Sequence, residues 1–287
     1  MNTQRRSHLC RLLAMSAGLP WLPGLALAAS DEAGRIEKAE PLQLGGESLL
    51  LQSRLLGETR RINVYLPEPY QQQPDLRLPL LLMPDGGMAE DFPHIAGLLQ
   101  VGIANGTVRP FILVGIENTQ RRRDLTPPSE EARDRAIAPQ IGGSALLRRF
   151  LREELLPLVE ARYRCTEERA IIGESLAGLF VLETLLLEPA LFSTAIAIDP
   201  SLWWNREQLL KELPARSAVL AHHRLFIASA DKDGNTAPIL RFVQQLRRLR
   251  PAGLDWHYQP MPDEGHATVY HPAALIAMRR LLKPASA

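Results

Sequence analysis

The sequence predicts an α/β protein in which a mostly parallel sheet of about eight strands carries helices on both faces. From residue 78 onward, short and fully apolar runs alternate with longer segments of helical spacing, and strands of this kind are buried on both faces. The length of 287 residues and the hydrophobic content of 46% suit one large domain with a substantial core.

The first residues predict a signal peptide over residues 1–28. Three arginines, Arg5, Arg6 and Arg11, precede the acid-free apolar run LLAMSAGLPWLPGLALA, which ends in an A-x-A pattern. The pattern predicts a periplasmic or secreted protein, exported by the Sec or the Tat route.

Neither the net charge nor the hydropathy of the sequence indicates binding to nucleic acid or to a membrane. Cleavage near Ala28 takes the formal net charge from +1 to about −2 and leaves Cys165 as the only cysteine, which excludes an intrachain disulfide. No later segment reaches the 18 or more uninterrupted apolar residues of a membrane span, so no stable membrane insertion is expected after cleavage.

A polar leader is expected over residues 29–46, followed by a single domain over residues 47–287. The domain begins with a predicted hairpin, SLLLQSRLL and TRRINVYLP, joined around Gly57-Glu58. The later predicted strands are LPLLLMP, FILVGI, RAIIG, TAIAI, RLFIAS and LDWHYQP, and the predicted helices cover residues 145–163, 176–188, 237–250 and 272–282. Residues 118–143 form a long polar insertion that is rich in Arg and Pro, a type of loop that is usually functional or mobile.

The stretch GESLAG (173–178) lies between a predicted strand and a predicted helix, and it matches the nucleophile elbow G-x-S-x-G with Ala177 in the last place. The positions two before and two after the serine must be small because the turn is tight. Ser175 is therefore the candidate nucleophile. The alternative is an ordinary serine N-cap on a strand-to-helix turn.

His266 is the candidate general base, since it lies in PDEGHAT, between the last predicted strand and the last predicted helix, in the chain order Ser, acid, His. His271 is the fallback, whereas His257 and the pair His222-His223 are expected in core or surface positions.

The acid that orients the histidine is expected after the penultimate strand, in RLFIASADKDGN. Asp233 is preferred there and Asp231 is the alternative, although both carboxylates can also simply solvate a turn. Further candidates are Asp199, Asp263 and Glu264.

An oxyanion hole needs two N–H donors. The sequence offers the amide of Leu176, after the nucleophile, and that of Gly87 or neighbouring Met88 in PDGGMAE. A type II turn that uses Gly86 and Gly87 is the alternative reading of that loop.

The chain resembles the putative-esterase family of α/β hydrolases, which includes the ferric-enterobactin esterases and related periplasmic trilactone esterases. The resemblance rests on VYLPEPY, LPLLLMPDGG, FILVGIENTQRRRDLTPP, FLREELLPLVEARYRCTEERAIIGESLAG, IDPSLWWN and GHAT, and it spans most of residues 60–282. It implies the α/β-hydrolase fold, with Ser175 as nucleophile, His266 as base and the acid in residues 231–233; some members use a Ser-His pair alone.

Two positions depart from the family pattern. Ala177 replaces a common glycine, and Asp199-Pro200-Ser201 stands where the family often has S-P-S, a difference that concerns specificity.

The resemblance also gives the insertion over residues 118–143 a role in substrate binding. Arg121, Arg122 and Arg123, with Trp203 and Trp204, are expected to bind a ferric catecholate siderophore, or else to be a solvated charge run and core aromatics.

The sequence thus predicts a secreted serine hydrolase of carboxylic esters that uses no metal or organic cofactor, since it lacks HExxH, a phosphate loop and any Cys/His cluster with ligand spacing. Its substrate is a small-molecule ester, of the siderophore trilactone type by resemblance, or a feruloyl or short-chain ester. A catalytically inactive ligand- or partner-binding protein is the alternative from another class.

Overall fold

The hairpin predicted at the start of the domain is present in the computed structural model, which describes residues 44–232 and 236–284. Strand β1 (Gly46–Gln52) pairs antiparallel with β2 (Thr59–Tyr65). The first strand begins one residue before the expected domain start at residue 47. The predicted signal peptide and nearly all of the leader lie outside the described residues.

Eight strands form one sheet in the order β1-β2-β4-β3-β5-β6-β7-β8. The other strands are β3 (Leu78–Pro84), β4 (Ile112–Ile116), β5 (Cys165–Glu174), β6 (Thr194–Ile198), β7 (Arg224–Ala230) and β8 (Asp255–Met261). β2 pairs antiparallel with β1 and β4, and all other neighbouring strands pair parallel. This arrangement is the predicted α/β-hydrolase fold.

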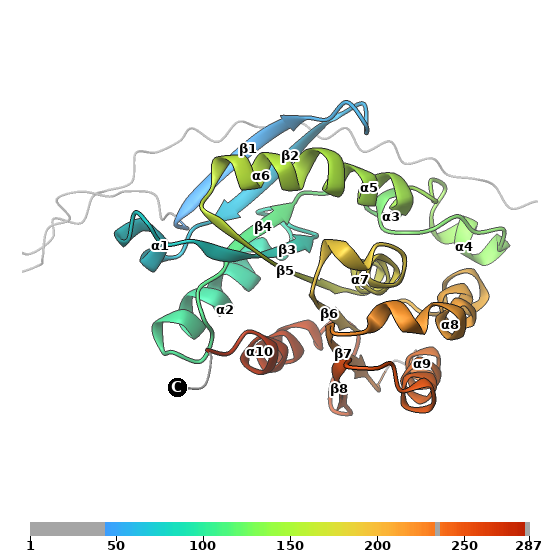
Figure 1. Cartoon of the computed structure of the whole chain (residues 1–287). Helices are drawn as coiled ribbons and strands as arrows, with labels where there is room; N and C mark the ends of the chain where they lie inside the picture. Colours follow the sequence, from blue (N-terminus) through green and yellow to red (C-terminus); the bar gives the residue numbers. More distant parts are fainter. Residues whose placement is uncertain (1–43, 233–235, 285–287) are drawn as a thin grey trace, which may run out of the picture. The chain divides into compact units, whose positions relative to one another are not determined.

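Helices cover both faces of the sheet (Figure 1). Their bounds are α1 (Glu68–Gln72), α2 (Phe92–Ala104), α3 (Arg121–Asp124), α4 (Ala132–Ile137), α5 (Ser144–Phe150), α6 (Leu156–Arg162), α7 (Leu176–Leu187), α8 (Trp204–Arg216), α9 (Thr236–Leu249) and α10 (Tyr270–Leu281). Helices α2 and α10 pack on one face, whereas α5 to α9 pack on the other. A π-helical turn, Leu151–Leu155, joins α5 to α6, so the predicted helix over 145–163 is continuous but not regular.

The central strands are apolar on both sides because each face meets helices. In β5, Ile171 packs into the core beneath α5 to α9, whereas Ile172 packs into the core beneath α2 and α10. In β6, Ala197 and Ile198 divide in the same way. Unbroken apolar runs in the sequence are the direct consequence.

The insertion over residues 118–143 contains α3 and α4, and buried charge fixes it to the sheet. Arg60 on β2, 1% exposed in its side chain, donates to Asp124 at 2.5 Å. Arg123 also donates to Asp124, at 2.6 Å. A charge pair that is buried this deeply must be matched, since unpaired charge is costly in the interior. The insertion is therefore tied to the domain at α3.

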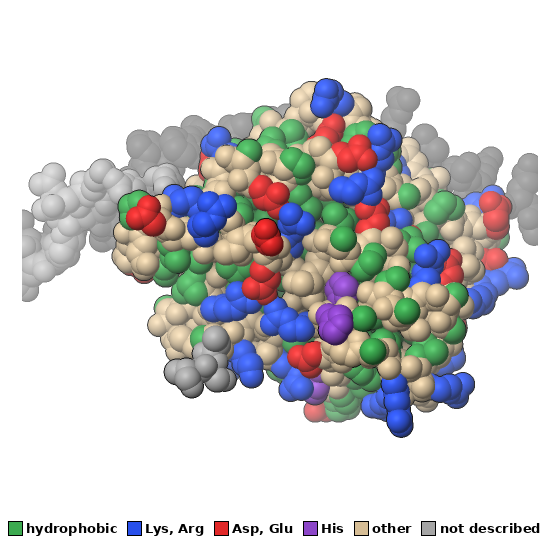
Figure 2. All heavy atoms as spheres, viewed as in Figure 1, with side chains coloured by type: hydrophobic (Ala, Val, Ile, Leu, Met, Phe, Trp, Pro, Cys, Tyr) green, Lys and Arg blue, Asp and Glu red, His purple; other side chains and the backbone are tan. Residues whose placement is uncertain are grey.

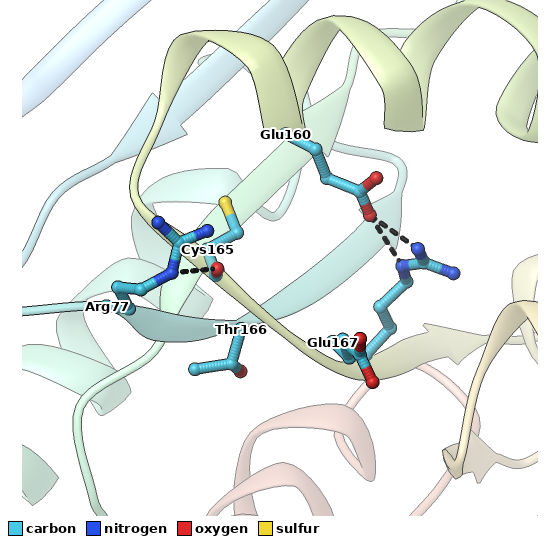
Figure 3. A pocket seen from close by; sticks show the side chains of 6 residues that line it. Arg77, Glu160, Cys165, Thr166 and Glu167 are labelled. Carbon is cyan, nitrogen blue, oxygen red and sulfur yellow. Dashed lines mark hydrogen bonds and ion pairs between the residues drawn. The ribbon is translucent and has the colours of Figure 1, made fainter.

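The parallel strands place their carboxyl ends at one edge of the sheet, which is where ligand sites of open α/β sheets form. The opposite end of β5 borders a separate pocket of about 640 Å³, lined by Arg77, Glu160, Cys165, Thr166, Glu167 and Arg169 (Figure 3).

On the face drawn in Figure 2, acidic and basic side chains are interspersed. None of the helices in the described part of the chain is both long and apolar enough to cross a bilayer.

Candidate active site

Ser175 lies on the tight turn between β5 and α7, as the elbow motif predicts. Its φ of 61° and ψ of −119° are strained values for a residue with a side chain, and such strain is typical of functional sites. A Cβ on Gly173 would lie 2.7 Å from the carbonyl carbon of Ala177, so both positions need small residues. The Ser175 side chain makes no capping hydrogen bond to α7, which argues against the N-cap alternative.

The structure brings His266 to Ser175. His266 lies in the loop between β8 and α10, and its Nε2 is 3.0 Å from Ser175 Oγ. On the other side of the ring, Nδ1 is 2.5 Å from Asp199 Oδ2. With the proton on Nδ1, His266 donates to Asp199, and its Nε2 lone pair can accept the hydroxyl proton of Ser175.

Asp199 directly follows β6 and is buried, with 4% of its surface exposed. Its φ is 41°, in the left-handed region that Asp adopts more readily than most residues. Its second oxygen, Oδ1, accepts the amide of Ala230 at 3.0 Å. The carboxylate is thus held rigidly between the end of β7 and the imidazole of His266.

The geometry therefore favours Asp199 over the acid that the sequence prefers. Asp231 is exposed, and the structure gives no hydrogen bond between its described side chain and His266. Asp233 lies outside the described residues. β6 lies between β5 and β7 in the sheet, so a residue at its end is closer to the elbow than chain order suggests.

The remaining histidines take other roles among the described residues. His271 Nδ1 lies 2.9 Å from His94 Nε2, and His257 Nε2 lies 3.3 Å from Gln259 Oε1. His223 contacts the backbone carbonyls of Ala221 and Pro189.

The loop after β3 differs from the expected oxyanion arrangement at Gly87. The Gly87 amide donates to Glu90 Oε2 at 2.7 Å, so it is engaged within its own loop. A Cβ on Gly86 would lie 2.3 Å from Gly115 Cα, so this glycine permits close packing on β4. No hydrogen bond of the Met88 amide is found among the described residues. Leu176 provides the first N–H of α7, which has no acceptor within the helix.

Of Arg121, Arg122 and Arg123, Arg121 acts on the elbow. Arg121 donates through Nε and Nη2 to the two oxygens of Asp85, at 2.7 Å each. Its charge also acts on Glu174, beside the nucleophile. Arg122 donates to the carbonyl of Ile137, and Arg123 is bound by acidic side chains, so both have structural partners.

The two tryptophans divide between core and surface. Trp204 is 2% exposed, and its Nε1 donates to the carbonyl of Pro127 at 3.0 Å. Trp203 is half-buried, and the guanidinium of Arg133 lies 5.0 Å above its ring. The segment after β6 thus contacts the insertion through both tryptophans. The same segment contains Ser201, whose Oγ is 3.4 Å from that of Ser175.

Glu174, the variable residue of the elbow, is a site residue that the sequence analysis does not single out. Its Oε1 lies 3.4 Å from His266 Nε2, and its side chain is 15% exposed. Burial raises the pKa of Glu174 to about 7, against the opposing charges of His266 and Arg121. No signal in the sequence distinguishes this glutamate, because the motif leaves its position open.

The three acidic and imidazole groups of the site lie close together. Glu174, Asp199 and His266 bring ligand atoms within 4.8 Å of one another, the one such group among the described residues. The Asp199 Oδ2 and His266 Nδ1 atoms are 2.5 Å apart, a hydrogen-bond distance, so these two atoms are engaged with each other.

Comparison with known proteins assigns the family. The model of the family described as "Putative esterase" matches residues 53–282. The chain belongs to this family. The match covers the strands that carry Ser175, Asp199 and the loop of His266.

Three relatives illustrate the similarity. The ferri-bacillibactin esterase BesA of Bacillus subtilis is 32% identical over 188 residues, 58% of this chain and 62% of that protein. The iron(III) salmochelin esterase of Escherichia coli is 26% identical over 230 residues, 74% of this chain. The chain spans about half of that relative's length, 52%. A crystal structure of an IroE-like serine hydrolase from Shewanella oneidensis superimposes with a TM-score of 0.74 at 31% identity, covering 83% of this chain and 80% of that one.

Proposed function

We propose that this protein is a serine carboxylic-ester hydrolase with Ser175 as nucleophile, His266 as general base and Asp199 as the acid that orients the base. The observation that carries the proposal is the unbroken chain of contacts from Ser175 Oγ through both imidazole nitrogens to Asp199, built on a strained elbow. Membership of an esterase family supports it.

The reaction follows from these contacts. Ser175 Oγ bonds to the ester carbonyl carbon as its proton passes to His266 Nε2, and the carbonyl electrons move to the oxygen. Collapse of this intermediate breaks the bond to the leaving alcohol, which takes the proton from Nε2. Water then repeats the sequence on the acyl-enzyme and releases the acid, which restores Ser175. Asp199 stabilises the imidazolium formed in both halves.

The oxyanion is bound by two backbone amides in this proposal. Leu176 supplies one, at the amino end of α7, where the helix dipole also favours negative charge. Met88 supplies the second in place of Gly87, whose amide already donates to Glu90. Each such donor contributes about 10²- to 10³-fold in rate in well-studied hydrolases.

The substrate class that we propose is a ferric siderophore with ester linkages, of the catecholate trilactone type. The names of the bacterial relatives as esterases of bacillibactin and salmochelin support it. So does the placement of Arg133 on the ring of Trp203, because a guanidinium and an indole suit an anionic catecholate. Among the described residues Arg133 forms no ion pair, unlike Arg121 and Arg123.

The predicted signal peptide gives the cellular setting of this proposal. Export by the Sec or Tat route would place the enzyme in the periplasm or outside the cell.

A substrate panel tests the proposal. We expect wild type to hydrolyse enterobactin, with and without iron, faster than methyl ferulate and p-nitrophenyl acetate, because the arginine and tryptophan groups favour catecholates. Ser175→Ala should lose at least about 10³-fold in turnover on every ester, as loss of a nucleophile does.

The panel also separates the alternatives. Preference for methyl ferulate would replace the siderophore class by a feruloyl esterase and keep the catalytic assignment. An unchanged rate in Ser175→Ala would reject Ser175 as the nucleophile. Lack of turnover on every ester by wild type would favour a binding protein on a hydrolase fold.

A further inference from the structure

The Nε2 atom of His266 faces two oxygen atoms. Ser175 Oγ lies 3.0 Å away and Glu174 Oε1 lies 3.4 Å away. This Oε1 atom is buried and has no hydrogen-bond partner among the described residues. A buried carboxylate oxygen without a hydrogen bond is costly, so its position beside the imidazole needs an explanation.

We infer that Glu174 is a second positioning residue for His266: its carboxylate stabilises the imidazolium on the Nε2 side when Ser175 gives up its proton. The inference rests on the proposed function, because it assigns Glu174 a role only through the general base. Asp199 then acts on one ring nitrogen and Glu174 on the other.

The charged and titratable groups around Glu174 leave His266 as its main partner. These groups are Asp85 after β3, Arg121 on α3, Asp199 after β6, His266 before α10 and Tyr270 on α10. Arg121 is the one permanent cation in that set, and both oxygens of Asp85 already bind it. The Arg121 charge that reaches Glu174 is therefore partly cancelled. Imidazolium is the remaining positive group.

The pH dependence follows with a definite sign. The pKa of Glu174, about 7, lies above the ordinary value because burial disfavours the charged form, so the carboxyl is neutral below about pH 7 and charged above it. The charged form stabilises the imidazolium of His266, whose Nε2 lies 3.4 Å away. Glutamate and histidine then titrate as a coupled pair, and the wild-type activity should rise through two overlapping ionisations.

The experiment compares kcat/KM from pH 5 to 9.5 for wild type, Glu174→Gln and Glu167→Gln on p-nitrophenyl acetate. Glu167 is an exposed residue on the same strand, at the pocket shown in Figure 3, so its substitution removes the same charge far from the site. Glu174→Gln should show a single ionisation, with its midpoint about one pH unit lower and a plateau about tenfold lower, because the base is weaker. Glu167→Gln should follow wild type.

The inference would be overturned if the kcat/KM profile of Glu174→Gln kept the midpoint and the shape of the wild-type profile, whatever the height of its plateau. A purely structural loss would lower kcat/KM by the same factor at every pH and leave the midpoint unchanged. A titration of the His266 ring by NMR in wild type is independent of any variant. It should show two inflections, and a single inflection would also overturn the role of Glu174. Ser175→Ala in the same assay keeps the two proposals distinguishable, because undiminished activity there rejects the serine mechanism itself.

Discussion

At the scale of single residues, the role that we propose for Asp199 follows from its place at the end of β6. Its two oxygens have separate tasks, one accepting the Ala230 amide at 3.0 Å and the other lying 2.5 Å from His266 Nδ1. A fixed carboxylate in this position selects the tautomer that leaves Nε2 free to accept a proton.

Asp199→Asn should therefore lower kcat by about 10²- to 10⁴-fold with little change in KM, because the amide no longer fixes the Nδ1–H tautomer. Steady-state kinetics on p-nitrophenyl butyrate measures the effect. Asp231→Asn is the matched control, since it removes a nearby exposed carboxylate, and it should stay within about twofold of wild type. The reverse order of effects would return the acid to the 231–233 turn.

The sequence predicts that Ser175 and His266 are neighbours, because the elbow motif identifies the serine and the chain order of the catalytic residues identifies the histidine. The structure brings the two side chains together. The acid is harder to predict, because carboxylates follow both β6 and β7 in the sequence and only side-chain packing distinguishes them. One signal for Asp199 is present in the sequence: a carboxylate stands where the family often has serine. By resemblance alone, that departure indicates a difference in specificity.

At the scale of secondary-structure elements, apolar runs predict the strands well because the sheet is covered on both faces. β3 and β6 coincide with LPLLLMP and TAIAI. β5 begins at Cys165, four residues before the predicted RAIIG, because the polar start of this strand lies at the sheet's margin. Helix α8 escapes prediction, since Asn205, Arg206 and Glu207 have left-handed backbone angles that no helical pattern anticipates.

The insertion is held by buried charge, which gives a stability prediction. Asp124→Ala should lower the free energy of unfolding by about 3 kcal/mol, because it leaves the buried Arg60 with Glu58 as its remaining acidic partner. Chemical denaturation followed by circular dichroism measures the change.

The control is the exposed pair in the same insertion. Glu130, 94% exposed, pairs with Arg135, and Glu130→Ala should change the free energy of unfolding by less than about 0.5 kcal/mol. Equal effects of the two substitutions would contradict the view that buried charge fixes the insertion to the sheet.

At the scale of the whole molecule, sheet order explains why distant segments of sequence meet. β5, β6 and β7 are neighbours and parallel, so the residues that follow them emerge at one edge of the sheet. Ser175 and His266 are separated by 91 residues along the chain yet lie in hydrogen-bond contact. The sequence predicts that these residues follow strands of a mostly parallel sheet, and such a sheet places the carboxyl ends of its parallel strands at one edge.

The hydrogen bonds inside the site are less predictable than this large-scale arrangement. Gly87 donates to Glu90 and Arg121 binds Asp85, although the sequence suggests ligand-facing roles for both. These contacts depend on side-chain packing between the loop after β3 and the insertion, which no periodicity in the sequence encodes. The same limit applies to Glu174, whose importance depends on its 3.4 Å separation from His266.

The central claim is that Ser175 is a nucleophile activated by His266. Labelling of the intact protein with a fluorophosphonate, followed by peptide mapping in a mass spectrometer, tests it most directly. We predict one adduct, on the peptide that contains Ser175, with none in Ser175→Ala and a labelling rate at least about 10²-fold lower in His266→Ala. An unmodified Ser175 in folded wild type, or equal labelling of His266→Ala, would contradict the claim.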